Sequence, residues 1–184
     1  MKRTAAVILA CAALLCPASG CGSKEQDTGK NYEKAAVTQQ MSDSYEDALK
    51  ECFDAIYSGG SGTIFYAYMY PDAVIEQMKA DNIYNELVST FEEGQHSSLE
   101  LSGRKLSYEK IVESHEINDN QRAAAKKYLK QLSEKIKPDL SEDDLDIKEG
   151  YEVTYSYLSD GESKGQDTVL VVKLNDEGWK VLTG

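Results

Sequence analysis

The chain has 184 residues, of which 32 are acidic and 20 are Lys or Arg, so its formal net charge at pH 7 is −12. Nucleic acids and anionic lipid surfaces repel a domain of this charge, while the charge favours solubility. The composition therefore argues against the DNA- and RNA-binding classes, and we expect no nucleic-acid partner.

The amino-terminal residues have the pattern of an export signal. Lys2 and Arg3 are followed by an apolar stretch, 5–16, that contains no charged side chain. A helix needs about 20 apolar residues to cross a bilayer, so this stretch is too short for a permanent anchor. We expect residues 1–20 to be a signal peptide that is removed on export.

A cysteine follows this leader directly. The segment Ala18-Ser19-Gly20-Cys21 resembles the lipobox of bacterial lipoproteins, in which a small residue precedes a cysteine. The resemblance implies that Cys21 is thioether-linked to diacylglycerol and becomes the first residue of the mature chain. Two acyl chains hold a protein on a membrane far longer than one, which would place this protein on the extracytoplasmic face of the cell membrane. The alternative is a secreted protein in which Cys21 is incidental.

The cysteine count fits this interpretation. Of the four cysteines, Cys11 and Cys16 would leave with the leader and Cys21 would be acylated, so only Cys52 would remain. The mature chain would then hold no intramolecular disulfide, and its core alone would stabilise it. Cys52 lies on the apolar stripe of a predicted helix, where we expect a buried, unreactive thiol.

A polar segment separates the lipidation site from the rest of the chain. Residues 21–41 carry few large apolar side chains and no sustained period, which predicts a flexible tether. No internal repeat and no second linker follow. We therefore expect residues 42–184 to form one domain.

The domain begins with helical patterns. An apolar stripe at three- and four-residue spacing follows a serine cap, Ser42 or Ser44, and ends at Gly59–Gly60. The segment 63–70 is ambiguous. Pro71 suits the first turn of a second helix, and a further helical stripe continues until Gly94, so the first half is predicted to be helical in three short pieces.

The period changes after Gly103. Residues 106–117 fit an extended strand with one phase slip, which predicts a bulge near Glu109 and Lys110. Asn118 and Gln121 match a capping box, and the helix that they begin is predicted to continue until Pro138. The predicted strands that follow are 151–157, 168–174 and 179–182, with turns at 159–161 and 176–178.

This order predicts an α+β fold in which N-terminal helices pack on one face of a curved antiparallel sheet. The terminal pattern VLVVKLNDEGWKVL resembles the last hairpin of small bacterial lipoproteins in the nuclear-transport-factor-2-like (cystatin-like) superfamily. The resemblance implies the same single-domain fold for residues 42–184. It implies no particular chemistry, because that superfamily contains enzymes, binding proteins and domains without a known role.

The aromatic residues are the candidates for ligand binding. The chain has 12 tyrosines against 3 phenylalanines, and the tyrosines are concentrated in 65–70 and 151–157. Tyrosine combines an apolar ring with a polar tip, which suits a half-wet cavity that stacks on an organic ligand. The predicted ligand-binding residues are Tyr108, Tyr155 and Tyr157. The alternative is that these rings form the rim of an ordinary core.

No pattern for catalysis or metal binding is present in the sequence. The acidic segment 139–146 lacks the glycine and glutamate of a calcium loop, and there is no Cys/His ligand spacing. His115 is the only histidine on a predicted strand, and it has no positioned acid–base partner in the sequence. We expect no catalytic residue, no metal and no cofactor.

Together these features predict a membrane-anchored lipoprotein whose domain is non-catalytic and binds a small ligand or another envelope protein. One alternative is an enzyme of the dehydratase or isomerase type that works in the same cavity. It requires an inward carboxylate or histidine opposite a tyrosine. A second alternative is a scaffold for surface assembly, which would show an exposed apolar patch.

Overall fold

A computed structural model describes residues 42–184 except 137, 139, 176 and 184. The predicted leader, the tether and the lipidation site Cys21 lie outside the described residues. The helices and strands follow the order α1 (Tyr45–Tyr57), α2 (Gly62–Met69), α3 (Asp72–Ala80), α4 (Tyr84–Ser102), β1 (Leu106–Glu116), α5 (Asp119–Ser133), β2 (Ile147–Ser159), β3 (Glu162–Leu174) and β4 (Gly178–Leu182).

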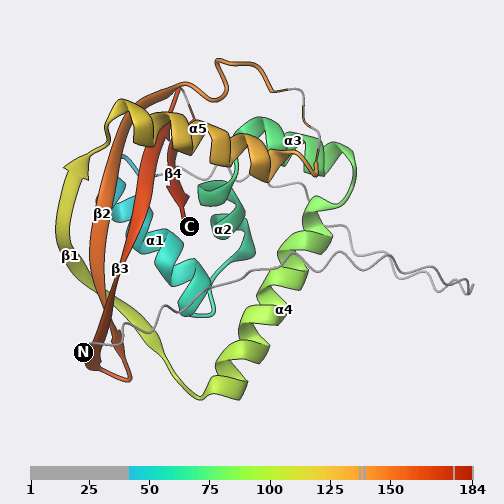
Figure 1. The fold of residues 1–184 in the computed structure, drawn as a ribbon. Coiled ribbons are helices and arrows are strands. Elements are labelled where there is room, and N and C mark those ends of the chain that lie inside the picture. Colours follow the sequence, from blue (N-terminus) through green and yellow to red (C-terminus); the bar gives the residue numbers. More distant parts are fainter. Residues whose placement is uncertain (1–41, 137, 139, 176, 184) are drawn as a thin grey trace, which may run out of the picture. The chain divides into compact units, whose positions relative to one another are not determined.

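The four strands form one antiparallel sheet in the order β1-β2-β3-β4. Its long strands bend, and the helices pack against the curved sheet (Figure 1). This arrangement confirms the predicted α+β fold with N-terminal helices on an antiparallel sheet.

The sheet is covered on both faces because successive side chains of a strand point to opposite sides. Val169 and Val171 of β3 pack in a cluster under α1, whose buried members include Leu49 and Phe53. We call this the α1 cluster. The alternate β3 residues Val172 and Leu174 pack in a second cluster with Ala125 and Leu129 of α5, which we call the α5 cluster. The N-terminal helix α1 thus lies on one face as expected, and α5 covers the other.

The first helix begins and ends where the sequence predicts. The Ser44 side chain accepts a hydrogen bond from the Asp47 backbone N–H at 3.1 Å, which caps α1. After Tyr57 the chain turns at Gly59, whose φ of +70° lies in the left-handed region that favours glycine. The ambiguous segment 63–70 is helical and lies almost entirely within α2.

Helix α4 is longer than predicted. It continues through Gly94 to Ser102 and ends at Gly103, which has a φ of +59°. In the described part of the chain, four helices precede β1 instead of the three predicted, because the segment 63–70 supplies α2. A glycine inside a helix costs only about 1 kcal/mol, and the half-buried stripe of Phe91 is continued by Gln95 and Leu99 beyond the glycine.

The capping signal of α5 is confirmed, and its predicted end is wrong. The Gln121 backbone N–H donates to Asn118 Oδ1, and the Asn118 N–H donates to Gln121 Oε1, each at 3.0 Å. The helix ends at Ser133, and a turn follows in which the Ile136 N–H donates to the Ser133 carbonyl at 3.0 Å. A proline biases only the residue directly before it away from the helical region, so Pro138 does not account for the end at Ser133.

The turns and bulges of the sheet follow local sequence. The β1–β2 register shifts between Tyr108 and Lys110, which confirms the predicted bulge, and a second shift lies between Ile111 and Glu113. Asp160 and Gly161 have φ values of +55° and +84° in the β2–β3 turn. A two-residue hairpin turn of type I′ has positive φ at both central residues, and Asp-Gly sequences favour this turn. Both strands of this hairpin extend beyond the predicted 151–157 and 168–174.

In the described part of the chain, no helix has the length and apolarity needed to cross a membrane.

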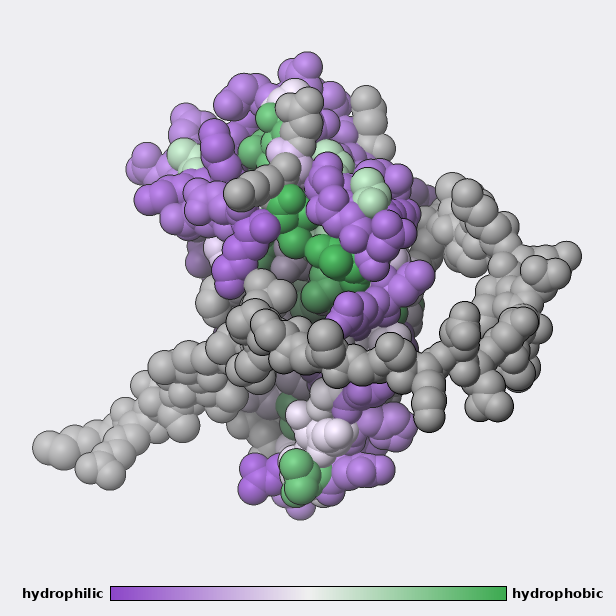
Figure 2. Space-filling model, turned by 90° about the vertical axis from the view of Figure 1, so that its right-hand side faces the viewer, coloured by the Kyte–Doolittle hydropathy of each residue, from purple (hydrophilic) through white to green (hydrophobic). Residues whose placement is uncertain are grey.

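Figure 2 shows the side of the molecule on which α3 and α4 lie. Most described side chains on this side are hydrophilic, and hydrophobic ones gather in a band near its middle. A third cluster, between α2, α3 and α4, includes buried Tyr66, Val74 and Met78.

Candidate functional site

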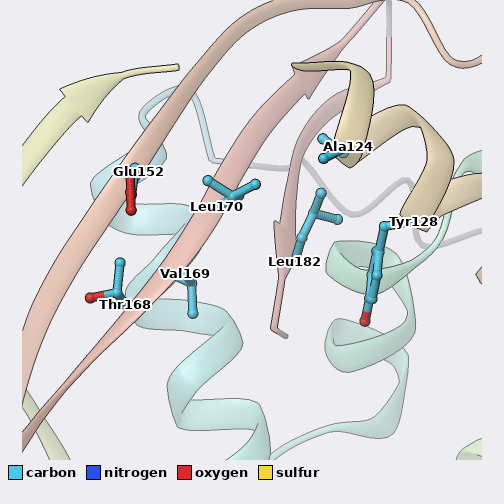
Figure 3. A pocket seen from close by; sticks show the side chains of 8 residues that line it. Ala124, Tyr128, Glu152, Thr168, Val169, Leu170 and Leu182 are labelled. Atoms are coloured by element: carbon cyan, nitrogen blue, oxygen red, sulfur yellow. The ribbon is translucent and has the colours of Figure 1, made fainter. Parts of the chain in front are cut away.

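A pocket of about 300 Å³ opens between α5 and the sheet face that α5 covers. Its walls come from one helix and three strands (Figure 3). The lining residues are Ala124, Ala125 and Tyr128 of α5, Glu152 of β2, Thr168, Val169 and Leu170 of β3, and Leu182 of β4. Most of these side chains are apolar, which is typical of sites for small organic molecules.

The small side chains of α5 leave the space for this pocket. Ala124 faces strands that present Leu170 and Leu182 on the opposite wall (Figure 3), and Ala125 also lines the pocket. An alanine fills much less volume than the leucines used elsewhere in the α5 cluster, so the helix and sheet do not close completely here. Ala125 is buried in that cluster, whereas Ala124 is exposed at the edge of the pocket.

Several side-chain hydrogen bonds hold α5 over the pocket. Gln121, already part of the capping box, uses its Nε2 to donate to Glu152 Oε2 of β2 at 2.6 Å. Arg122 donates from Nη1 to the Ile147 carbonyl at the start of the same strand. Tyr128 donates its hydroxyl to the Thr183 carbonyl at 2.9 Å, which ties the helix to the end of β4. These bonds fix both ends of the pocket wall.

Two polar side chains, Glu152 and Thr168, line the strand side of the pocket. Glu152 is half-buried and brings one carboxylate to the lining. Thr168 is paired across the sheet with Thr154 by a hydroxyl–hydroxyl contact of 2.9 Å. The pocket thus combines apolar walls, one aromatic ring and a single negative charge, and it can hold a small apolar molecule that has a polar end.

The three predicted ligand-binding tyrosines lie together on the opposite face of the sheet, within or against the α1 cluster. The Tyr155 side chain is only 5% exposed, and its ring centroid lies 5.7 Å from that of Phe53 in α1. Burial raises the pKa of the Tyr155 hydroxyl above its ordinary value. Tyr155 therefore packs as a core residue beneath α1.

The other two tyrosines flank it at the surface. The Tyr108 ring centroid lies 6.0 Å from that of Tyr155 in a stacked arrangement, and the Tyr157 ring centroid lies at 6.5 Å. Both residues are half-buried. The hydroxyl end of Tyr157 occupies the space above Gly165, its partner on β3, where a Cβ would collide with it. A ligand platform made of these tyrosines stays a prediction.

Two other candidates occupy ordinary positions. His115 is exposed, and its Nε2 forms a 2.5 Å contact with Glu113 Oε1 on the outer strand β1. Cys52 is buried in the α1 cluster, and burial raises the pKa of its thiol to about 12. Among residues 42–184 without the four undescribed positions, no group of three or more His, Cys, Asp or Glu side chains is arranged to hold a metal ion.

The pocket under α5 was not predicted from the sequence. The available signal was the run Ala123-Ala124-Ala125 on a helix whose later turns carry Tyr128 and Leu129. Small residues on the packing side of a helix mark a place where a neighbouring element comes close or a space remains. The sequence alone does not distinguish these two outcomes.

Comparisons of the chain with protein-family models, with curated proteins and with solved structures found no match.

Proposed function

We propose that this protein is a membrane-anchored extracytoplasmic lipoprotein whose domain binds a small, largely apolar molecule in the pocket between α5 and the sheet. The observation that carries the binding role is the pocket itself, with its apolar walls and single carboxylate. The leader pattern and Cys21 support the membrane location. The helix-first order and the curved sheet support a place in the nuclear-transport-factor-2-like (cystatin-like) superfamily.

The polar groups of the pocket support a binding role over a catalytic one. The Glu152 carboxylate accepts a hydrogen bond from Gln121, and the Tyr128 hydroxyl donates to the Thr183 carbonyl. Groups held in this way position α5 against the sheet. A general acid–base pair needs both of its groups free to transfer a proton, and here the Tyr128 hydroxyl already donates to a backbone carbonyl.

The membrane location is tested with a Cys21→Ser variant expressed in the native host. We expect the wild-type protein in the membrane fraction and the variant in the soluble extracytoplasmic fraction or the medium, since acyl chains supply the attachment. Mass spectrometry of the wild-type amino terminus should find Cys21 acylated. Unchanged membrane retention of the variant, or an unacylated mature terminus, would refute the anchor.

The binding role is tested by filling the pocket. Ala124 lies at the exposed edge of the lining, so Ala124→Trp blocks the pocket without enlarging a buried core residue. Ala123→Trp is the matched control, because Ala123 is exposed on the same helix and does not line the pocket. A neutral apolar probe such as 3-phenylpropan-1-ol should shift the NMR signals of Leu170 and Leu182 in the wild type and in Ala123→Trp. It should not shift them in Ala124→Trp.

One observation favours an enzyme of the dehydratase or isomerase type as the second candidate. That alternative requires a carboxylate opposite a tyrosine, and Glu152 and Tyr128 both line the pocket, one on a strand and one on the helix (Figure 3). A Glu152→Gln variant separates the two functions. If the variant still binds a substrate but no longer converts it, the result supports the enzyme. Both functions predict that the variant keeps its affinity for the neutral probe.

A further inference from the structure

We propose that the molecule bound under α5 is an amphiphilic cation, with an apolar body between α5 and the sheet and a protonated amine on the Glu152 carboxylate. This inference rests on the proposed function and names the chemical class of its ligand. The apolar body would contact Leu170 and Leu182, which line the pocket beside the alanines of α5. The amine would contact the only acidic side chain in the lining that the structure describes.

The charge of Glu152 is available to a ligand. Its described hydrogen-bond partner is the neutral amide of Gln121, which uses one carboxylate oxygen, Oε2. In the described part of the chain, no lysine, arginine or histidine forms an ion pair with it. A half-buried carboxylate without a cationic partner attracts a cation more strongly than an exposed one does, because water screens it less.

The basic side chains near the pocket contact other acceptors. His115 is the cross-strand partner of Glu152, yet its Nε2 contacts Glu113. On α5, Arg122 donates to the Ile147 carbonyl, and the Lys126 Nζ lies 3.6 Å from Asp146 Oδ1. Among the described residues, these contacts leave no basic side chain paired with Glu152. An incoming ammonium can supply the positive charge and form a charge-assisted hydrogen bond.

The aromatic wall of the pocket suits the same ligand. The Tyr128 side chain comes from α5 at the far end of the lining from Glu152 (Figure 3). An apolar ligand body that extends from the carboxylate toward this ring would bury carbon atoms against Leu170 and Leu182. An anionic ligand would instead place its charge against Glu152, in a domain whose net charge is already strongly negative.

Three probes with one carbon skeleton test this assignment: 3-phenylpropylamine, 3-phenylpropan-1-ol and 3-phenylpropanoate. They are titrated into the purified full-length protein at pH 7 and followed by NMR. Probes of this size bind with Kd values on the order of 1 mM. We expect the amine to bind about tenfold more tightly than the alcohol, as a half-buried charge-assisted hydrogen bond allows, and the propanoate to bind more weakly than both.

The role of Glu152 is tested in the same titrations. Glu152→Gln should remove the preference for the amine and leave the affinity for the alcohol unchanged, which also shows that the variant is folded. Glu86→Gln on α4 is the matched control, since it removes the same charge from an exposed residue outside the lining, and it should keep the preference.

The possible results separate the two proposals. If the alcohol and the amine bind equally in the wild type and Ala124→Trp abolishes both, the pocket binds ligands and the cation assignment is wrong. If the preference for the amine survives in Glu152→Gln, the assignment is also wrong, because the overall charge then explains it. If none of the three probes binds the wild type, the proposed binding function itself fails.

Discussion

The ammonium group of Lys180 lies 3.2 Å from Asp72 Oδ1, although the lysine side chain has no exposed surface. Lys180 is on β4, one of the two edge strands, and its Nζ also donates to the Ala67 carbonyl of α2 at 3.1 Å. The Glu177 carboxylate is a further neighbour at 3.6 Å. One buried cation therefore links the end of the sheet to the junction between α2 and α3.

Replacing this lysine should destabilise the domain. Lys180→Met keeps much of the side-chain volume but leaves Glu177, whose side chain is only 12% exposed, without a compensating charge. Removing one partner of a buried ion pair costs about 3 kcal/mol or more. We expect a loss of about 3 kcal/mol in the free energy of unfolding, measured by urea denaturation.

Two further variants identify the source of this cost. Asp72→Asn should cost less than about 1 kcal/mol, because the Asp72 side chain is 62% exposed and water replaces its charge interaction. The double variant Lys180→Met/Glu177→Gln should recover part of the lost stability. If Asp72→Asn proves as costly as Lys180→Met, the buried carboxylate is not the cause.

Glu177 should make the stability depend on pH. Burial raises the pKa of its carboxyl above the ordinary value of 4.5, although Lys180 and the Asp72 backbone N–H oppose this shift. The folded state then binds the proton more tightly than the unfolded state. The stabilisation from protonated Glu177 is fully present below pH 4.5 and is lost as the pH rises through the folded pKa.

The comparison of wild type with Glu177→Gln measures this effect. The wild-type free energy of unfolding minus that of the variant should decrease as the pH is raised from about 4 to 7, because the glutamine does not titrate. A difference that stays constant over this range, or that increases, would contradict the raised pKa.

Cys52 should not react in the folded protein. Its side chain is 1% exposed, and burial raises the thiol pKa to about 12, so almost no thiolate is present at pH 8. In a variant whose other cysteines are serine, Ellman's reagent should label one thiol only after urea unfolds the chain. Labelling within seconds in buffer alone would show that the α1 cluster opens readily.

Two tyrosine variants distinguish a core role from a ligand role. Tyr155→Ala should lower the free energy of unfolding by about 3 kcal/mol, as truncation of a buried aromatic side chain does, because it empties the space beside Phe53. Tyr157→Ala should cost clearly less, because Tyr157 is half-buried. Equal costs for the two variants would contradict the assignment of Tyr155 as the core residue of the pair. If Tyr155 is a core residue, ligand binding on this face is best tested with Tyr108→Ala and Tyr157→Ala.

The cap of α5 should contribute a measurable part of the stability. Asn118→Ala removes the side-chain oxygen that accepts from the Gln121 backbone N–H, which costs about 1 kcal/mol at a helix N-terminus. The Ser44→Ala variant at the start of α1 provides a comparison, since the same type of bond is removed there. A cost near zero for Asn118→Ala would show that Gln121 and Glu152 fix the helix end without it.

The features that the sequence predicts correctly depend on residues close together in the chain. The Asn118–Gln121 capping box, the turn at Asp160 and Gly161 and the bulge after Tyr108 each follow from a few neighbouring side chains. The order of helices and strands follows in turn from these local signals. Together they were sufficient for the α+β fold class.

The features that were missed depend on contacts between distant segments. Helix α4 continues through Gly94, and its Leu99 side chain lies near Gly59, a residue far away in the sequence. The sequence shows an apolar stripe on α5 but not which face of the sheet it covers. The pocket arises where Ala124 and Ala125 leave volume unfilled, and the absence of a side chain produces no periodic signal.

Strand β3 supplies side chains to both the α1 cluster and the α5 cluster, through Val169 and Val171 on one side and Val172 and Leu174 on the other. Neither layer can melt and leave the other intact, since each would lose the strand on which it rests. Heating should therefore give a single calorimetric transition, with the slowest amide hydrogen exchange in the middle of β3. The half of α4 beyond Gly94, where Leu101 is 89% exposed, should fray well before that transition.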